Sequence, residues 1–398
     1  MRTLFLALLL FSMLHAQNID TLIAQAIKNH PSLEAIKHRL TAMDARIAKS
    51  KKWENPDLSV TINDIQFSDI SNRSIEPMQF EAFNVKQKFP WFGKTDAKQR
   101  IEEARKHLLL ESYDAAKVAL ALQIRQSAYT IKELERRIAI LHKYIQLART
   151  NITLFTDTIA TDSMSHADSV TAELSLYKIE VQMERYRAIL KAQREKLAYL
   201  VGRKVTNIST PLRLHKPPAL GYYLNKMKHN PSLGMKAKQT DVAQAKEKLT
   251  DLEAMPDPYV KMGYYHRESF EDYGALTVGI AAPLYGTEAL NTEIARKERL
   301  SSQSDYLDYK ARLESEIRAE YVRLRESYRI YYIIKDKSLP QLDHMLELSA
   351  AAIEKGADLF TYTNILEQKL ALEEERIAAA AEFMRTKAKL KALTGEIR

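Results

Sequence analysis

The sequence predicts a mainly α-helical fold with a small β part, in which long antiparallel coiled-coil helices are joined to four strands. Three observations predict it. Apolar residues recur at spacings of three and four over very long segments, short segments alternate apolar and polar residues, and the whole pattern occurs twice. With only 10 glycines and 28% charged residues, the 398-residue chain also has the composition of long exposed helices.

The first residues have the pattern of a secretory signal peptide. Arg2 precedes an apolar run at 4–14, and Ala16 offers a small residue for cleavage, so we predict a signal peptide over 1–16. The run is shorter than the roughly 20 apolar residues that a membrane-spanning helix needs. No later segment is long and apolar enough to span a bilayer as a helix, so the exported protein would enter a membrane only with strands.

The composition excludes several functional classes. The chain has no cysteine, which excludes disulfides, thiolate metal sites and cysteine nucleophiles. Its net charge of +9 is spread along the chain without a basic block, so we expect no nucleic-acid partner. No nucleophile–base constellation, glycine-rich phosphate loop or metal-spaced cluster appears in the sequence. We therefore predict no enzyme activity, no cofactor and no metal site, and we interpret the Met- and His-containing segment 162–168 as a polar loop.

The first copy of the repeated pattern begins with a helix over about 31–52, which has a proline at its start. Alternating apolar and polar residues at 58–63 then predict a strand, and a polar loop at 66–79 leads to a second strand that ends at Phe89. Pro90 cannot donate to a β-ladder, so the chain should leave the sheet there and enter a long helix.

The long helices carry the strongest pattern. A strict alternation of four and three predicts a coiled-coil seam in the first copy at Ile124, Ser127, Ile131, Leu134, Ile138, Leu141, Ile145, Ala148 and Ile152. A helix of about sixty residues would be roughly 90 Å long, which exceeds what a globular domain needs. In the second copy Pro340 lies within the corresponding helix and should bend it or break a turn. Each long helix is followed by a turn and a returning helix.

The second copy follows the first at nearly constant offsets. Pro231-Ser232-Leu233 repeats Pro31-Ser32-Leu33 after 200 residues, and the strand–proline–aromatic–glycine corner that ends at Gly93 returns at Gly286 after 193 residues. We therefore divide the chain into a signal peptide at 1–16, a first repeat at 17–202, an equatorial linker at 203–225 and a second repeat at 226–398. The two repeats are expected to form one domain.

The four predicted strands have the length and polarity of tilted membrane strands. Aromatic residues near their ends are predicted to form a girdle at a membrane interface: Phe80, Phe89, Trp91, Phe92, Tyr259, Tyr273 and Tyr285. Lys86, Lys88 and Lys261 on the polar strand faces are predicted to line a barrel lumen and to prefer anions. Four strands cannot close a barrel, so two copies would give eight strands and three would give twelve. The alternative is an amphipathic sheet packed on a soluble core.

These features resemble the TolC family of outer-membrane efflux channels over essentially the whole mature chain. The resemblance rests on the duplicated His/Asn-Pro-Ser-Leu helix starts, the strand-Pro-x-x-Gly-helix corners, the segment 339–341, the turn at 356–366 and Leu-Thr-Gly at 393–395. The corner at 89–94 is most similar to the cation-efflux branch. The resemblance implies a homotrimer in which four strands per chain form a twelve-stranded transmembrane β-barrel above an α-barrel of helices. It also implies an outer-membrane protein that extends into the periplasm and works with a periplasmic adaptor and an inner-membrane pump.

The resemblance implies a gate as well. In the family, two acidic residues on the inner helix just after the second tip surround the closed end of the tunnel. Glu367 stands at one of these places, but Asn364 stands at the other and departs from the family pattern. Asp358 is a further candidate for the tip. Three Glu367 carboxylates around an axis would favour cations, and the alternative is a solvated helix charge beside Lys369.

The predicted function is that of a passive exit duct of a tripartite efflux system, set in outer-membrane lipid and conducting heavy-metal cations or small toxic compounds. The alternative is a periplasmic coiled-coil adaptor or structural protein. An adaptor would carry one helical hairpin flanked by glycine-rich β modules, whereas this chain has two hairpins and little glycine. A secreted enzyme is a third possibility, which the absence of a recognisable catalytic constellation disfavours.

Overall fold

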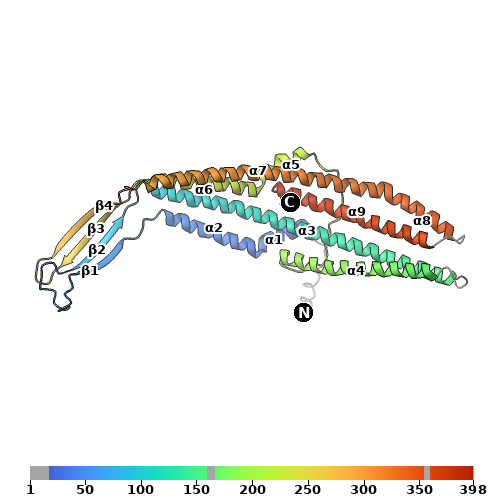
Figure 1. The fold of residues 1–398 in the computed structure, drawn as a ribbon, viewed down its shortest axis with the longest axis horizontal. Helices are drawn as coiled ribbons and strands as arrows, with labels where there is room; N and C mark the ends of the chain where they lie inside the picture. Colours follow the sequence, from blue (N-terminus) through green and yellow to red (C-terminus); the bar gives the residue numbers. More distant parts are fainter. Residues whose placement is uncertain (1–17, 159–165, 354–358, 398) are drawn as a thin grey trace, which may run out of the picture. The chain divides into compact units, whose positions relative to one another are not determined.

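The computed structural model describes residues 18–158, 166–353 and 359–397, which form long helices and one four-stranded antiparallel sheet (Figure 1). The predicted fold class, mainly α with a small β part, is confirmed. The predicted signal peptide lies outside the described residues, as do Asp358 and most of the segment 162–168.

The chain forms two compact units. The helical unit contains the residues up to Glu34, Asp114–Pro231 and the residues from Ala311 onward, and the strand unit contains Ala35–Tyr113 and Ser232–Lys310. The boundary between them falls within two long helices, α3 (Lys94–Thr158) and α7 (Thr287–Ile333). Each unit therefore takes segments from both predicted repeats.

The sheet of the strand unit joins the two repeats. Its members lie in the order β1 (Asp57–Asn63), β2 (Phe80–Lys88), β3 (Pro258–His266) and β4 (Tyr273–Ile280), and every neighbouring pair is antiparallel. The central pair, β2 and β3, comes from different repeats, with Val85 opposite Met262. One sheet thus holds the four strands that the alternating segments predict (Figure 1).

Ion pairs link neighbouring helices of the strand unit. Lys106 of α3 binds Asp44 of α2 (Pro31–Ser50) with 2.6 Å between Nζ and Oδ1. In the second repeat, Arg299 of α7 binds Glu247 of α6 (Pro231–Glu253) at 2.6 Å. The two repeats therefore pair their first helix with the beginning of their long helix in the same way.

Both strand-to-helix corners contain a glycine with a left-handed backbone. Gly93 has φ of +84° and Gly286 has φ of +70°, and a long helix begins at the next residue in each case. A residue with a Cβ is strained at such φ values, at a cost of roughly 1–2 kcal/mol. The repeated glycine therefore has a backbone reason, which supports the corners that the sequence predicts.

The helical unit is held together by the predicted seam. Its core brings Leu141, Tyr144 and Ile145 of α3 against Leu176, Ile179 and Met183 of α4 (His166–Val201) and against Leu366 and Leu370 of α9 (Leu359–Leu393). Farther along α3, Ile124 and Ile131 are also buried. The 4–3 periodicity identified this face correctly because the spacing places these side chains on one stripe of the helix.

Pro340 breaks the regular helix, as predicted. A π-helical turn at Ile334–Ser338 separates α7 from α8 (Leu339–Ile353), because a proline offers no backbone N–H and its ring disturbs the preceding turn. The remaining short helices, α1 (Ile19–Asn29) and α5 (Leu220–Lys226), precede the first helix of each repeat. No helix among the described residues has an apolar stretch long enough to cross a membrane.

Candidate functional site

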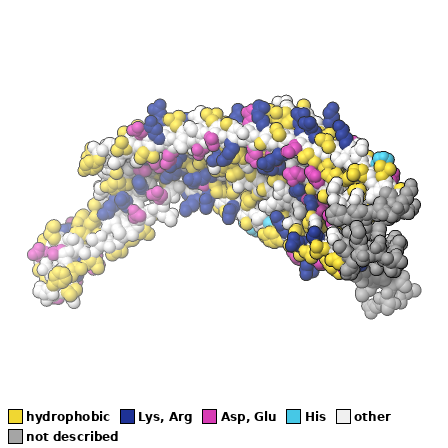
Figure 2. Space-filling model, turned by 45° about the vertical axis from the view of Figure 1, so that its right-hand side comes forward, with side chains coloured by type: hydrophobic (Ala, Val, Ile, Leu, Met, Phe, Trp, Pro, Cys, Tyr) yellow, Lys and Arg dark blue, Asp and Glu magenta, His cyan; other side chains and the backbone are white. Residues whose placement is uncertain are grey.

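The sheet has one apolar face that nothing in the strand unit covers. The strand register places the following side chains on this face: Leu58, Val60, Ile62, Phe83, Val85, Val260, Met262, Leu276, Val278 and Ile280. Val60 is 73% exposed and Leu276 is 68% exposed. Figure 2 shows hydrophobic side chains over the strands at the lower left, whereas Lys and Arg are more frequent over the helices. The polar residues of this face, such as Glu81 and His266, lie toward the strand ends.

The opposite face of the sheet is polar. The side chains on it include Ser59, Thr61, Asn84, Lys86, Lys261 and Thr277. Lys86 and Lys261 lie directly opposite each other on β2 and β3. Tyr259 is on the same face, with its ring centroid 4.6 Å from Lys86 Nζ. Because the faces alternate along each strand, one apolar surface and one polar surface extend over all four strands.

The register also separates the predicted aromatic girdle into two groups. Phe80, Tyr259 and Tyr273 share the polar face with the lysines, and Tyr273 stacks on Tyr265 with 4.7 Å between ring centroids. Phe89, Trp91, Phe92 and Tyr285 instead follow the ends of β2 and β4, near the two corners. Phe92 and Tyr285 are 88% and 91% exposed. The predicted girdle residues therefore lie in two places, four near the corners and three on the polar face of the sheet.

A buried ion pair fixes the first corner to the second repeat. Lys94 Nζ donates to Asp257 Oδ1 at 2.6 Å and to the carbonyl oxygen of Met255 at 2.5 Å. Asp257 also accepts a hydrogen bond from the backbone N–H of Trp91 at 2.8 Å. Burial disfavours the charge of Asp257, but the bonds from Lys94 and Trp91 outweigh it and hold the pKa of Asp257 below its usual value.

The predicted gate residues lie at the beginning of α9. Glu367 is exposed, and with Tyr144 of α3 and Leu176 of α4 it lines a small cavity of about 30 Å³. Asn364 is also exposed and accepts a hydrogen bond from Gln368 at 3.1 Å. Lys369 binds Asp343 of α8, and no described cation lies within ion-pair distance of Glu367. The Glu367 carboxylate thus has no neighbour that neutralises it among the described residues.

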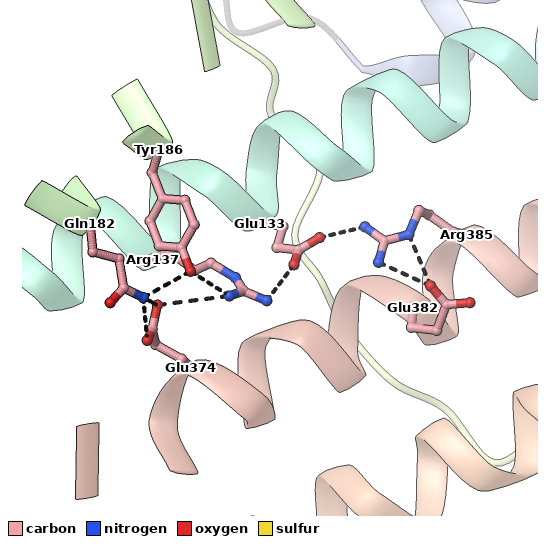
Figure 3. Close-up of polar contacts among 7 residues, drawn as sticks. All are labelled: Glu133, Arg137, Gln182, Tyr186, Glu374, Glu382 and Arg385. Atoms are coloured by element: carbon pink, nitrogen blue, oxygen red, sulfur yellow. Dashed lines mark hydrogen bonds and ion pairs between the residues drawn. The ribbon is translucent and has the colours of Figure 1, made fainter. Parts of the chain in front are cut away.

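A polar network joins three helices of the helical unit (Figure 3). Glu133 of α3 accepts from Arg137 at 2.8 Å and also binds Arg385 of α9. Arg137 donates to the Tyr186 hydroxyl of α4 at 2.8 Å. Gln182 of α4 donates to Tyr186 at 3.0 Å and to Glu374 of α9 at 2.9 Å. The network therefore ties the hairpin of the first repeat to the returning helix of the second.

Burial and charge act in opposite directions in this network. Burial disfavours the charged form of Arg137, yet Glu133 and Tyr186 together raise the pKa of Arg137 above its usual value. Burial likewise opposes the charge of Arg385, and Glu133 and Glu382 raise the pKa of Arg385. No sequence pattern predicts this network, because it joins residues that are far apart in the chain. Its local signals are the i,i+4 pairs Glu133/Arg137 and Gln182/Tyr186 and the i,i+3 pair Glu382/Arg385, and such spacings are common on helices.

Comparisons with known proteins agree with this architecture. Residues 22–203 match the family model described as outer membrane efflux protein. No curated protein matches the sequence significantly. Among solved structures, the outer membrane protein VceC from Vibrio cholerae is similar, with a TM-score of 0.78, 15% identity and coverage of 96% of this chain and 97% of VceC. The CmeC outer membrane channel of Campylobacter jejuni has a TM-score of 0.76, 12% identity and coverage of 95% and 86%. CusC has a TM-score of 0.73, 13% identity and coverage of 97% and 96%.

Proposed function

Because residues 22–203 match the family model described as outer membrane efflux protein, we propose that the chain is a member of this family and the outer-membrane exit duct of a tripartite efflux system. Such a duct conducts its cargo passively and carries out no chemistry. In this proposal three copies assemble into one twelve-stranded barrel, a periplasmic adaptor binds the helical ends, and an inner-membrane pump supplies the energy. The cargo is heavy-metal cations or small toxic compounds.

The two-faced sheet is the observation that carries the proposal. A large apolar surface on a soluble protein would be unfavourable, at about 25 cal/mol for each Å² of apolar area left in water. Lipid removes this cost for the apolar face, and a water-filled lumen suits the polar face. The sheet also ends in two strands, β1 and β4, whose outer edges pair with no other strand in the part of the chain that the structure describes. In lipid such edges must pair, so neighbouring copies supply the missing strands.

The same observation disfavours the alternative of a periplasmic adaptor or structural coiled-coil protein. Such a protein works in water and would cover or avoid an apolar sheet face of this kind. The exposed aromatic residues at both corners, among them Phe92 and Tyr285, suit a membrane interface and have no role in a soluble rod.

In the proposed duct, Glu367 contributes to a carboxylate ring near the end of the tunnel. The side chain is exposed, close to the start of α9, and free of a neutralising cation among the described residues. Three such carboxylates would raise the local concentration of cations. Asn364 lies one helical turn earlier, where the family has a second acidic residue. Its amide is neutral, so the proposed gate has one carboxylate ring in place of two.

Single-channel conductance of the purified protein in a planar bilayer tests the duct and the ring together. Wild type should give discrete conductance steps, and Glu367→Ala should shift the reversal potential in a KCl gradient toward anions because a negative charge is lost. Glu375→Ala, on the same helix and with the same loss of charge, is the matched control and should leave the selectivity closer to that of wild type.

The possible outcomes separate the two parts of the proposal. Conductance steps that ignore Glu367→Ala would retain the duct and reject the carboxylate ring. If neither protein forms channels and the purified protein is a monomer by mass, the duct itself is rejected.

A further inference from the structure

The centre of the polar sheet face contains two lysines that face each other. Lys86 of β2 is directly opposite Lys261 of β3, and both side chains are half-buried. Like charges directly opposite each other in a sheet are destabilising. No described acidic side chain lies within ion-pair distance of either ammonium group, since neither lysine takes part in any of the described salt bridges. The pair therefore concentrates positive charge at the centre of this face.

The packing of Tyr259 keeps this charge close to the sheet. Its ring lies against Gly279 of β4, where an added Cβ would come within 2.5 Å of ring atoms. Lys86 Nζ lies 4.6 Å from the ring centroid, in a cation–π contact that holds the ammonium group without neutralising it. Tyrosine and glycine thus position the lysine above the middle strands.

The other charged groups of this face do not balance the pair. Asp57 of β1 lies opposite Lys86 and is exposed. Lys88, two residues farther along β2, lies 3.7 Å from Asp257, which Lys94 already engages. Glu81 belongs to the opposite, apolar face. The strands thus offer three lysines and one aspartate to the polar face, a surplus of two positive charges in each chain.

We propose that the outer-membrane part of the duct is selective for anions, through Lys86 and Lys261, and that, of the two cargo classes proposed above, it carries small toxic compounds that are anionic. The inference rests on the proposed function, because the polar face lines a lumen only when several copies close a barrel. Two lysines from each copy then form a ring of positive charge. A ring of this kind raises the local anion concentration and repels cations.

The experiment is the reversal potential of single channels in a KCl gradient, with the trimeric protein in a planar bilayer. In Lys86→Gln/Lys261→Gln the permeability ratio of chloride to potassium should fall at least about twofold below that of wild type. The difference should be larger near 0.1 M than near 1 M salt, because the Debye length falls from about 10 Å to about 3 Å over that range.

Two further variants control this test. Lys86→Arg/Lys261→Arg preserves the charge and should preserve the permeability ratio. Lys106→Gln removes a lysine outside the sheet, which is paired with Asp44, and should change the ratio little. Channels whose ratio is the same in wild type and in the double Gln variant would overturn the anion ring and leave the duct intact. Absence of channels from wild type and from Glu367→Ala alike, together with a monomeric mass of the purified protein, would reject the duct and this inference with it.

Discussion

At the scale of single residues, Asp257 shows how one side chain can join two repeats. Its counterpart in the first repeat, Asp57, is exposed, whereas Asp257 is only 19% exposed and receives bonds from Lys94 and from the backbone of Trp91. The Lys94 side chain is itself only 5% exposed. The two aspartates occupy equivalent positions in the repeats, but Asp257 forms an ion pair with Lys94 whereas Asp57 is exposed.

We predict that Asp257→Asn lowers stability by about 2–3 kcal/mol, because it leaves a buried ammonium group without its counter-charge. The effect should depend on pH. The pKa of Asp257 is lowered from 3.8, so its contribution is fully present above that value and is lost as the pH falls through the lowered pKa. The helical circular dichroism signal, followed during heating in detergent, should show wild type and variant converging as the pH falls below the lowered pKa of Asp257. A constant difference at every pH would contradict this assignment.

At the scale of helices, the network of Figure 3 connects elements that their apolar seams alone would allow to slide. Leu and Ile side chains fill space between helices without fixing one register, whereas each polar group in the network has a specific partner. Glu133 is the central member, since it binds Arg137 within α3 and Arg385 of α9. These bonds therefore fix the position of the last helix of the second repeat along the hairpin of the first repeat.

We predict that Glu133→Gln lowers the free energy of unfolding by about 2–3 kcal/mol, because Arg137 and Arg385 each lose one of their two carboxylate partners in a largely buried site. The variant should lose its helical signal at a lower temperature than wild type. Glu184→Gln is the control, because Glu184 and its partner Arg187 have side chains that are 66% and 50% exposed. Removal of such a surface pair should cost no more than about 0.5 kcal/mol. Equal losses in the two variants would show that the network contributes no more than a surface pair.

At the scale of the whole molecule, the proposed barrel requires other copies of the chain to complete the sheet. The apolar face is exposed, and the outer edges of β1 and β4 pair with no other strand among the described residues. The sequence contains no cysteine, so introduced cysteines supply the only thiols in the chain and disulfide cross-linking can test this arrangement.

We predict that Ser59→Cys on β1 and Thr277→Cys on β4, combined in one chain, will form disulfides between chains under mild oxidation. Both residues lie on the polar face, so their thiols would meet when β4 of one copy pairs with β1 of the next. A non-reducing gel should show a ladder that stops at three chains. Either single variant lacks a partner thiol at the contact between β1 and β4 and should stay monomeric on the gel. The closed barrel would be contradicted if this double variant stays monomeric and if double variants with cysteines at neighbouring positions of β1 and β4 stay monomeric as well.

The periodic features of the fold can be predicted from the sequence. The seam residues from Ile124 to Ile152, the alternating strands, the corner glycines and the break at Pro340 each follow from local spacing or from backbone chemistry, which a single segment contains. The duplication and the resemblance to efflux channels followed from the same signals. For this reason the sequence predicts both the fold class and the functional class.

Contacts between residues that are distant in the sequence are seen only in the tertiary structure. Glu133 and Arg385 are separated by 252 positions, and no local pattern links them. The face on which Phe80, Tyr259 and Tyr273 lie depends on the register of β2, β3 and β4, because a shift of one residue moves every side chain to the other face. The same register sets Lys86 against Lys261. Periodicity determines which residues of an element share a face, whereas long-range pairing determines which other residues that face contacts.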